Sequence, residues 1–304
     1  MPVKYIEQDC KTILHKIDTK RLPFNYGVNP YRGCFHSCVY CFARYTHSYL
    51  DLNPESDFEN IIIVKKNADR VLQRQLSNPK WKKEVVCLGS VCDPYQPIEK
   101  KYQLTRNMLQ KFWRFKTPIT IATKSDLIVR DKDILADMTQ HVPLNVAMSI
   151  ATLNEDLRKE IEPRVPSTLK RLKVINELRE KGIVVGVLLM PVIPFINDSE
   201  EELEQLVKLI AENGIDFFIF GILYLIGASK KRFLDFIQKT HPELYDKFQL
   251  FYKLRSPPIS YKNKIYNNLR KLRTKYSLNS SPNAIFLPKV NSQLTIDQWF
   301  SIEK

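Results

Sequence analysis

Apolar residues of two different periods alternate along the chain from about residue 60 to residue 223. Short, nearly continuous apolar runs are typical of strands buried on both faces, whereas apolar residues at helical spacing indicate amphipathic helices. The expected strands cover 84–90, 118–124, 143–150, 183–193 and 215–223. The expected helices cover 67–76, 104–115, 131–140, 167–182 and 199–214. This alternation predicts an α/β fold with a parallel sheet, and a barrel is one form of such a fold.

Composition narrows the class of protein. The chain has 304 residues, of which 44% are hydrophobic and 26% are charged, and this excludes a disordered or fibrous chain. No apolar run reaches the roughly 18 residues of a membrane-spanning helix, and the N-terminus lacks the apolar stretch of a secretory leader. We therefore expect a cytoplasmic protein without a membrane segment.

The formal net charge of +14 is concentrated near the C-terminus. Residues 230–276 hold thirteen basic and only three acidic side chains. A basic segment is attracted to polyanions, and aromatic rings beside cations suit single-stranded nucleic acid. The interleaved rings are Phe248, Phe251, Tyr252, Tyr261 and Tyr266. The residues expected to contact nucleic acid are Arg270, Lys271, Arg273 and Lys275. Alternatively, the rings pack the segment onto the body and the lysines are only solvated.

The change in pattern after Gly227 suggests three segments. We expect an N-terminal segment at 1–23, a core domain at 24–228 and a basic, mainly helical C-terminal extension at 229–304. Residues 280–300 are expected to pack irregularly on the body and to end in a short cap.

Three of the six cysteines form a C-x3-C-x2-C motif in the loop NPYRGCFHSCVYCFAR: Cys34, Cys38 and Cys41. One loop can fold three thiolates around one metal centre, and thiolates are ligands for iron–sulfur clusters and zinc. A zinc site needs a fourth ligand, such as His36 or His47. A four-iron cluster with three cysteines instead keeps open positions on one iron, where a substrate or cosubstrate can bind.

The motif, followed by about six β/α units, resembles the radical S-adenosylmethionine (SAM) enzymes. The strings NPYRGCFHSCVYCFARYTHSYL, GSVCDPYQPIE and EPRVPS are similar to those of the spore photoproduct lyase-like branch, often labelled DNA repair photolyase. The resemblance extends from about residue 25 to residue 227. It implies a partial (β/α)6 radical SAM barrel with a 4Fe-4S cluster on the three cysteines, SAM on the fourth iron, and an external flavodoxin- or ferredoxin-like reductant. It also implies reductive cleavage of SAM to a 5′-deoxyadenosyl radical, which takes hydrogen from a substrate.

The resemblance assigns further residues to SAM. Lys124 is the expected cation for the SAM carboxylate, unless it is a solvated lysine at a strand end. Ser149 is expected at the ribose, unless its hydroxyl is satisfied within the protein. The segment 89–99 is expected to face the SAM amino group, although Asp93 and Glu99 have the alternative role of caps or surface acids.

The other expected SAM residues lie in the cysteine loop and after three of the strands. Arg164 either reaches the SAM carboxylate or pairs with Glu162. The remaining members of the set are Tyr40, Gly89, Ser90 and Asn197.

Two positions depart from true spore photoproduct lyases. A cysteine that donates hydrogen is found there where this chain has Ser90, and a tyrosine of a proposed radical relay is found where it has Phe42. Cys92 lies two residues beyond Ser90 and would face the same way on an extended segment. Cys92 is therefore either a displaced hydrogen donor or a small apolar filler.

We expect a radical SAM enzyme, of lyase type in this branch, that acts on nucleic acid. One alternative is a radical SAM enzyme acting on a peptide or a small molecule. The alternative from another class is a metal-stabilised nucleic-acid-binding protein without catalysis.

Overall fold

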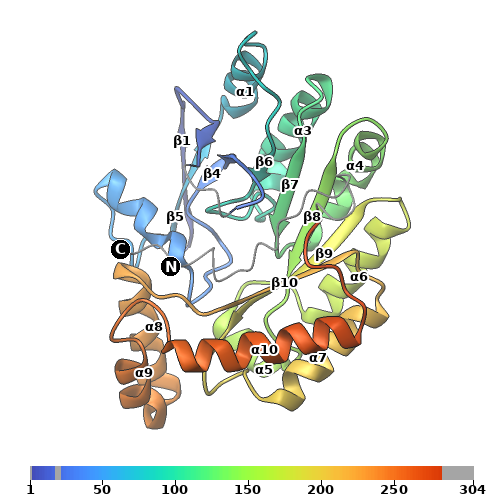
Figure 1. The fold of residues 1–304 in the computed structure, drawn as a ribbon. Helices are drawn as coiled ribbons and strands as arrows, with labels where there is room; N and C mark the ends of the chain where they lie inside the picture. The colour runs from blue at the N-terminus through green and yellow to red at the C-terminus, as the bar shows by residue number, and fades with distance from the viewer. Residues whose placement is uncertain (1, 18–21, 283–304) are drawn as a thin grey trace.

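The computed structural model describes residues 2–17 and 22–282, and six parallel strands form its central sheet (Figure 1). In spatial order these strands are β10 (Phe217–Ile222), β9 (Val184–Val192), β8 (Leu144–Ser149), β7 (Ile119–Thr123), β6 (Val86–Leu88) and β3 (Tyr26–Val28). Strand β2 (His15–Lys16) pairs antiparallel with β3 at one edge. The predicted partial (β/α)6 barrel is confirmed.

Helices follow the strands and lie around the outside of the sheet (Figure 1). They are α1 (Ala68–Leu76), α3 (Leu104–Arg114), α4 (Lys132–Thr139), α6 (Thr168–Arg179) and α7 (Glu200–Glu212). Each lies within a range expected from apolar periodicity. Their buried faces and the strands form one large apolar cluster, in which Leu109 and Ile175 accompany Val146 and Val185. Because the strands are buried among apolar side chains, their sequences are apolar runs rather than alternating ones.

A separate three-stranded sheet supports the cysteine loop. Strand β5 (Ile61–Lys65) is parallel to β1 (Lys4–Gln8) and antiparallel to β4 (Tyr31–Arg32). The Cys34 amide donates to the Phe58 carbonyl (3.0 Å), just before β5. This hydrogen bond fixes the backbone at the first motif cysteine.

Four further helices follow the cysteine loop or strands β6, β7 and β8. They are η1 (Phe42–Leu50), α2 (Glu99–Tyr102), η2 (Asp126–Asp131) and α5 (Glu155–Ile161).

The described part of the C-terminal extension, up to residue 282, is mainly helical, as expected. It contains α8 (Gly227–Thr240), η3 (Pro242–Leu244), α9 (Tyr245–Phe251) and α10 (Ile259–Lys275). The boundary predicted after residue 228 falls inside α8, so no linker separates the extension from the barrel. The division into domains stays a prediction. Most of the predicted irregular segment at 280–300 lies outside the described residues.

The extension packs directly on the cysteine loop. Phe233 and Ile237 of α8 and Phe248 of α9 are fully buried in an apolar cluster that also contains Val39, between two of the cysteines. Beyond α10, the Asn279 carbonyl accepts from the Phe218 amide (2.8 Å), so this segment covers the open edge of β10. Among the described residues, no helix has the length and apolarity that crossing a membrane requires.

Candidate active site

The three motif cysteines follow β3 and β4 at the carboxyl end of the barrel strands. All three are free thiols; Cys34 and Cys38 are buried, and Cys41 is partly buried. Burial raises the pKa of Cys38 well above its usual value, and the other two thiols act on it in the same direction. The sequence can make this loop because Gly33 has a φ of +86°, and a Cβ there would come within 2.8 Å of two backbone carbonyls.

The donor set fits an iron–sulfur cluster better than a single zinc ion. Within 2–17 and 22–282, no three His, Cys, Asp or Glu side chains lie close enough to hold one metal ion. The histidines expected as zinc ligands are engaged elsewhere, His36 with Asp93 (3.3 Å) and His47 with the Ile61 carbonyl (2.9 Å). A four-iron cluster does not need the three thiolates to meet at one metal ion, because each thiolate binds a different iron.

Lys124 brings a positive charge to the cysteines. Its Nζ lies 5.8 Å from the centre of the Tyr40 ring, and no carboxylate of the described chain is within ion-pair distance. Burial lowers the pKa of Lys124, but Cys38 and Glu162 outweigh burial and raise it. An ammonium without a direct counter-ion near two of the motif thiols, Cys38 and Cys41, suits a ligand that carries a carboxylate. The role of Lys124 at the SAM carboxylate stays a prediction.

A buried ionic network holds Tyr40 next to that ammonium. The Tyr40 hydroxyl donates to Glu162, and Glu162 forms an ion pair with Arg171 of α6 (3.0 Å). Arg171 also donates to the Ser149 carbonyl (2.7 Å), at the end of β8. Burial raises the pKa of Glu162, but Arg171 and Lys124 outweigh it and keep the pKa below its usual value. Both Glu162 and Arg171 are 0% exposed, whereas Tyr40 is partly buried.

Arg164 does not form the ion pair that was one of its two expected roles, because Glu162 pairs with Arg171 instead. The Arg164 guanidinium lies 5.0 Å from the ring centre of Phe35, which is itself a residue of the cysteine loop. The guanidinium also donates to the Glu59 carbonyl (3.4 Å). It therefore covers the cysteine loop from the outside.

A tight turn and buried hydrogen bonds fix the segment that follows β6. Gly89 has a φ of +95°, and a Cβ there would lie 2.5 Å from the Ala122 carbonyl, so this turn requires glycine. The alternative of surface acids for Asp93 and Glu99 is wrong, since both are buried. Glu99 accepts from the Tyr31 hydroxyl (2.5 Å) and from Arg130 (2.9 Å).

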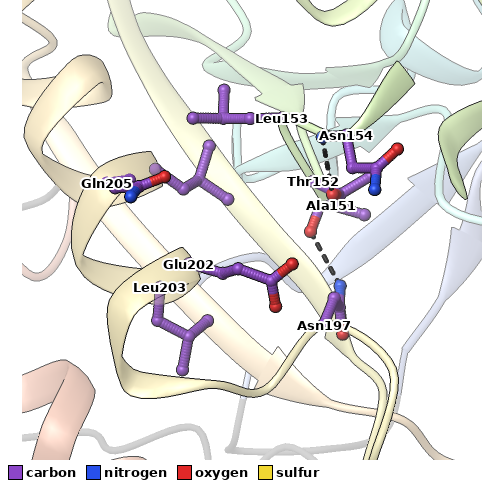
Figure 2. A pocket seen from close by; sticks show the side chains of 9 residues that line it. Ala151, Thr152, Leu153, Asn154, Asn197, Glu202, Leu203 and Gln205 are labelled. Carbon is purple, nitrogen blue, oxygen red and sulfur yellow. Dashed lines mark hydrogen bonds between the residues drawn. The ribbon is translucent and has the colours of Figure 1, made fainter. Parts of the chain in front are cut away.

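Ser149 and Asn197 lie at the ends of β8 and β9. Ser149 is buried. Asn197 donates to the Ala151 carbonyl (2.8 Å) and accepts from the Ile193 amide (2.5 Å), so its amide fixes two neighbouring turns. Figure 2 shows Asn197 at one side of a pocket of about 350 Å³, between these turns and α7. None of the three motif cysteines lines this pocket.

Ser90 and Cys92 both contact the side chain of Asn29, although the segment between them is bent rather than extended. Asn29 donates to the Ser90 hydroxyl (2.9 Å). The Cys92 thiol donates to the Tyr31 carbonyl (3.2 Å) and lies in an apolar cluster, where burial raises its pKa. These contacts favour Cys92 as an apolar filler. Phe42 is 47% exposed, directly after the last motif cysteine.

The basic extension is less open than its composition suggests. Phe248, Tyr252 and Tyr266 are buried, so these rings cannot stack on bases. Lys275 pairs with Glu204 (2.5 Å), and the Arg273 guanidinium lies 5.5 Å from the ring centre of Phe220. The same α10 surface carries Arg270, whose guanidinium lies 5.9 Å from the Tyr266 ring centre, and Lys271, which is exposed.

Comparison with known proteins assigns the class. Residues 28–210 match the Radical SAM superfamily. An uncharacterized protein of Mycobacterium tuberculosis is 38% identical over 280 residues, which cover 91% of this chain and 82% of the relative. An uncharacterized protein of Methanocaldococcus jannaschii is 29% identical over 221 residues, 73% of this chain and 78% of the relative. The chain belongs to the radical SAM superfamily.

Solved structures agree on the fold. A spore photoproduct lyase variant with bound SAM and dinucleoside spore photoproduct superposes with a TM-score of 0.66 at 15% identity, over 90% of this chain and 79% of that one. SuiB of Streptococcus suis bound to SAM gives a TM-score of 0.53 at 16% identity, over 100% of this chain and 53% of that one. The protein is thus a radical SAM enzyme with the fold of spore photoproduct lyase.

Sequence reasoning missed several residues of this site. Arg171 was not singled out, because its position in an amphipathic helix is equally typical of a solvated arginine. Gln96, which accepts from the Phe35 amide and donates to the Gly33 carbonyl, was also missed, as were Arg32 and Lys65. No local pattern marks them, since their partners are distant in sequence.

Proposed function

We propose that this enzyme binds a 4Fe-4S cluster through Cys34, Cys38 and Cys41 and holds SAM against it with Lys124, Tyr40 and Ser149. The observation that carries the proposal is the ammonium of Lys124, which lies without an ion-pair partner near the Cys38 and Cys41 thiols at the carboxyl edge of the barrel. When bound, the cluster and SAM supply a 5′-deoxyadenosyl radical that abstracts hydrogen from a substrate. Anaerobic incubation of the reconstituted protein with dithionite and SAM, with 5′-deoxyadenosine as the product measured, tests this directly.

The protein's own residues set the conditions for this chemistry. The Tyr40, Glu162 and Arg171 network excludes water from one side of the thiols and fixes the Tyr40 ring. Gly89 and Asn197 shape the turns that we propose lie against SAM. Enzymes of this superfamily generally take their electron from an external reductant, and we propose a flavodoxin- or ferredoxin-like donor in the cytoplasm.

Lys124→Ala should weaken SAM binding while leaving the cluster in place. A charge-assisted hydrogen bond contributes roughly 1.5–3 kcal/mol, so the affinity should fall about ten- to a hundredfold. Titration calorimetry with the reconstituted protein measures it, and Lys132→Ala, which removes a half-exposed lysine paired with Glu177, is the matched control. Unchanged affinity in Lys124→Ala would return Lys124 to the role of a solvated lysine.

We further propose a nucleic acid as the substrate, and a pair of cations, Lys65 and Arg32, supports this. Lys65 Nζ donates to the Asn29 carbonyl (2.8 Å), and Asn29 in turn holds Ser90. Burial lowers the pKa of His15, and the positive charges of Lys65 and Arg32 lower it further, so His15 is an uncharged imidazole that lies near both cations. No carboxylate of the described residues forms an ion pair with any of them. A partly buried cationic group without acids favours a phosphate.

The two basic regions can be compared in one binding experiment. Arg32→Gln/Lys65→Gln should weaken binding of a labelled single-stranded oligonucleotide and reduce the salt slope by about two, since each lost phosphate contact removes about one counterion. The matched comparison is the fourfold variant in which Arg270, Lys271, Arg273 and Lys275 are changed to Gln. Fluorescence anisotropy at several salt concentrations measures both. A slope that changes only in the fourfold variant would move the nucleic-acid surface to α10.

The departures at Ser90 and Phe42 limit how closely the reaction follows spore photoproduct lyase. If Cys92 is the hydrogen donor, its thiol has to leave the contact with the Tyr31 carbonyl. A peptide or small-molecule substrate is the alternative. An oligonucleotide that neither binds nor increases formation of 5′-deoxyadenosine would favour that alternative.

A further inference from the structure

The side chain of Gln96 reaches from the segment after β6 to the cysteine loop, and it is 0% exposed. Its Oε1 accepts from the Phe35 amide (3.1 Å), and its Nε2 donates to the Gly33 carbonyl (3.3 Å). These two peptide groups flank Cys34, whose own amide donates to the Phe58 carbonyl (3.0 Å). The backbone around the first motif cysteine is therefore held by the segment before β5 and by one glutamine.

The backbone that carries Gln96 is itself fixed. Pro94 and Pro97 lie on either side of it in the chain, and proline restricts the backbone to one value of φ. The Thr105 hydroxyl donates to the Pro94 carbonyl (2.6 Å), and the Glu99 amide donates to the Gln96 carbonyl (2.9 Å). The glutamine side chain therefore extends from a rigid turn, and its amide meets the cysteine loop at a set position.

Asp93, at the start of the same turn, holds the strand end that carries Lys124. Its carboxylate accepts from the Lys124 amide (2.7 Å) and the Thr123 hydroxyl (2.8 Å), so it is engaged within the protein. The Asp93 carbonyl accepts from Gln96 Nε2 (3.4 Å). The turn at 93–96 therefore contacts both the cysteine loop and the end of β7.

We propose that Gln96 is a positioning residue that keeps Cys34 and Lys124 in a fixed spatial relation. This inference rests on the proposed function, in which Cys34 binds the cluster and Lys124 holds the SAM carboxylate. A ligand that contacts the cluster and the ammonium at once needs a constant spacing between them. Such spacing is set by buried groups behind the ligand-binding residues, and among the described residues Gln96 is bonded to both sides of Cys34 and to Asp93.

The apoprotein gives the first test. Gln96→Met keeps most of the side-chain volume and removes both hydrogen bonds to the cysteine loop. The Cys34 thiol should then be alkylated about tenfold faster than in the wild type, since the loss of buried hydrogen bonds makes local opening of the loop easier. Gln96→Glu, which keeps an acceptor for the Phe35 amide, should give an intermediate rate. Peptide mapping with fragmentation in the mass spectrometer reads each thiol separately.

Gln75→Met is the matched control. Gln75 accepts from the Ile13 amide (2.8 Å) and the Leu14 amide (3.1 Å), so this variant also loses two hydrogen bonds from a glutamine to the backbone, but outside the site. It should leave the alkylation rate of Cys34 at the wild-type value.

Cys87, a buried thiol of β6, reports unfolding in every variant. Wild-type alkylation of Cys34 in Gln96→Met overturns the proposal, and so does an equal increase in the Gln75→Met control. If Gln96→Met exposes Cys87 as well, Gln96→Glu decides, because it keeps one of the two hydrogen bonds.

The reconstituted protein gives the second test, which a merely structural role would not pass. Gln96→Met should weaken SAM binding, and Lys124→Ala should then cost at least about threefold less affinity than it does in the wild type, since residues linked through one network are not additive. Titration calorimetry with the two single variants and the double variant measures this. Losses that multiply independently overturn the proposal, because Gln96 would then not act on Lys124.

The two levels of inference fail in different ways. If Cys34 loses its protection in Gln96→Met but the wild type neither binds nor cleaves SAM, the proposed function fails and the role of Gln96 at Cys34 stands. If the wild type cleaves SAM and the alkylation of Cys34 is unaffected, the positioning role fails alone.

Discussion

Cys38→Ala should lose the brown iron–sulfur chromophore, or keep only an incomplete cluster, and all reductive cleavage of SAM should stop. The Cys38 thiol is buried. The Cys92 thiol does not replace it as a cluster ligand, because Cys92 donates a hydrogen bond to the Tyr31 carbonyl. Iron and sulfide analysis after anaerobic reconstitution, followed by assay of 5′-deoxyadenosine, measures both losses.

The control for this prediction is Cys87→Ala, which removes a buried thiol from β6 outside the cysteine loop. It should keep both the chromophore and the activity. A Cys38→Ala protein that cleaves SAM at the wild-type rate would contradict the assignment of the motif to the cluster.

Arg171→Leu should destabilise the fold by about 3–5 kcal/mol, because it leaves the Glu162 carboxylate buried without its counter-charge. Both side chains are 0% exposed, and the change also removes the donor to the Ser149 carbonyl. Urea unfolding monitored by circular dichroism measures the loss. Adding Glu162→Gln in the same chain should restore part of the stability, since no uncompensated charge remains.

Arg179→Leu on the same helix is the matched comparison for Arg171→Leu. Its guanidinium is partly exposed and lies 3.7 Å from Asp216, so the loss should not exceed about 1 kcal/mol. Equal losses in the two variants would contradict a special role for the buried pair.

The parallel sheet was predictable from apolar periodicity because four of its strands, β7 to β10, are buried runs of five to nine residues, whereas the barrel form was implied by the family resemblance. Strand β9 spans nine residues, and such a run stands out from the polar segments around it. Strand β3 was not recognised, since it has only three residues and includes Gly27. A Cβ at Gly27 would come within 2.7 Å of the Ser90 Oγ, so this glycine reflects a contact with a residue far along the chain.

The cysteine motif was predictable because its chemistry is local in sequence. The groups around it were not, because burial depends on partners that are distant in the chain. The sequence alone is compatible with Asp93 as a surface acid, whereas the fold places it against the Lys124 amide and His36. The sequence is likewise compatible with a solvated Arg171, whereas the fold pairs it with Glu162. The prediction of a nucleic-acid surface from net charge failed to account for burial in the same way. The charge of the C-terminal segment does not indicate that Tyr252 and Tyr266 are buried.

The packing of α8 and α9 on Val39 has a consequence for how the enzyme is made. The cysteine loop leaves the ribosome before Phe233, Phe248 and Tyr252, which share the apolar cluster of Val39. A nascent chain therefore has its thiols exposed before their support exists. Insertion of iron and sulfide into a fully supported loop has to wait until synthesis has passed α9, and the assembly machinery of the cell would meet a folded protein rather than a growing one.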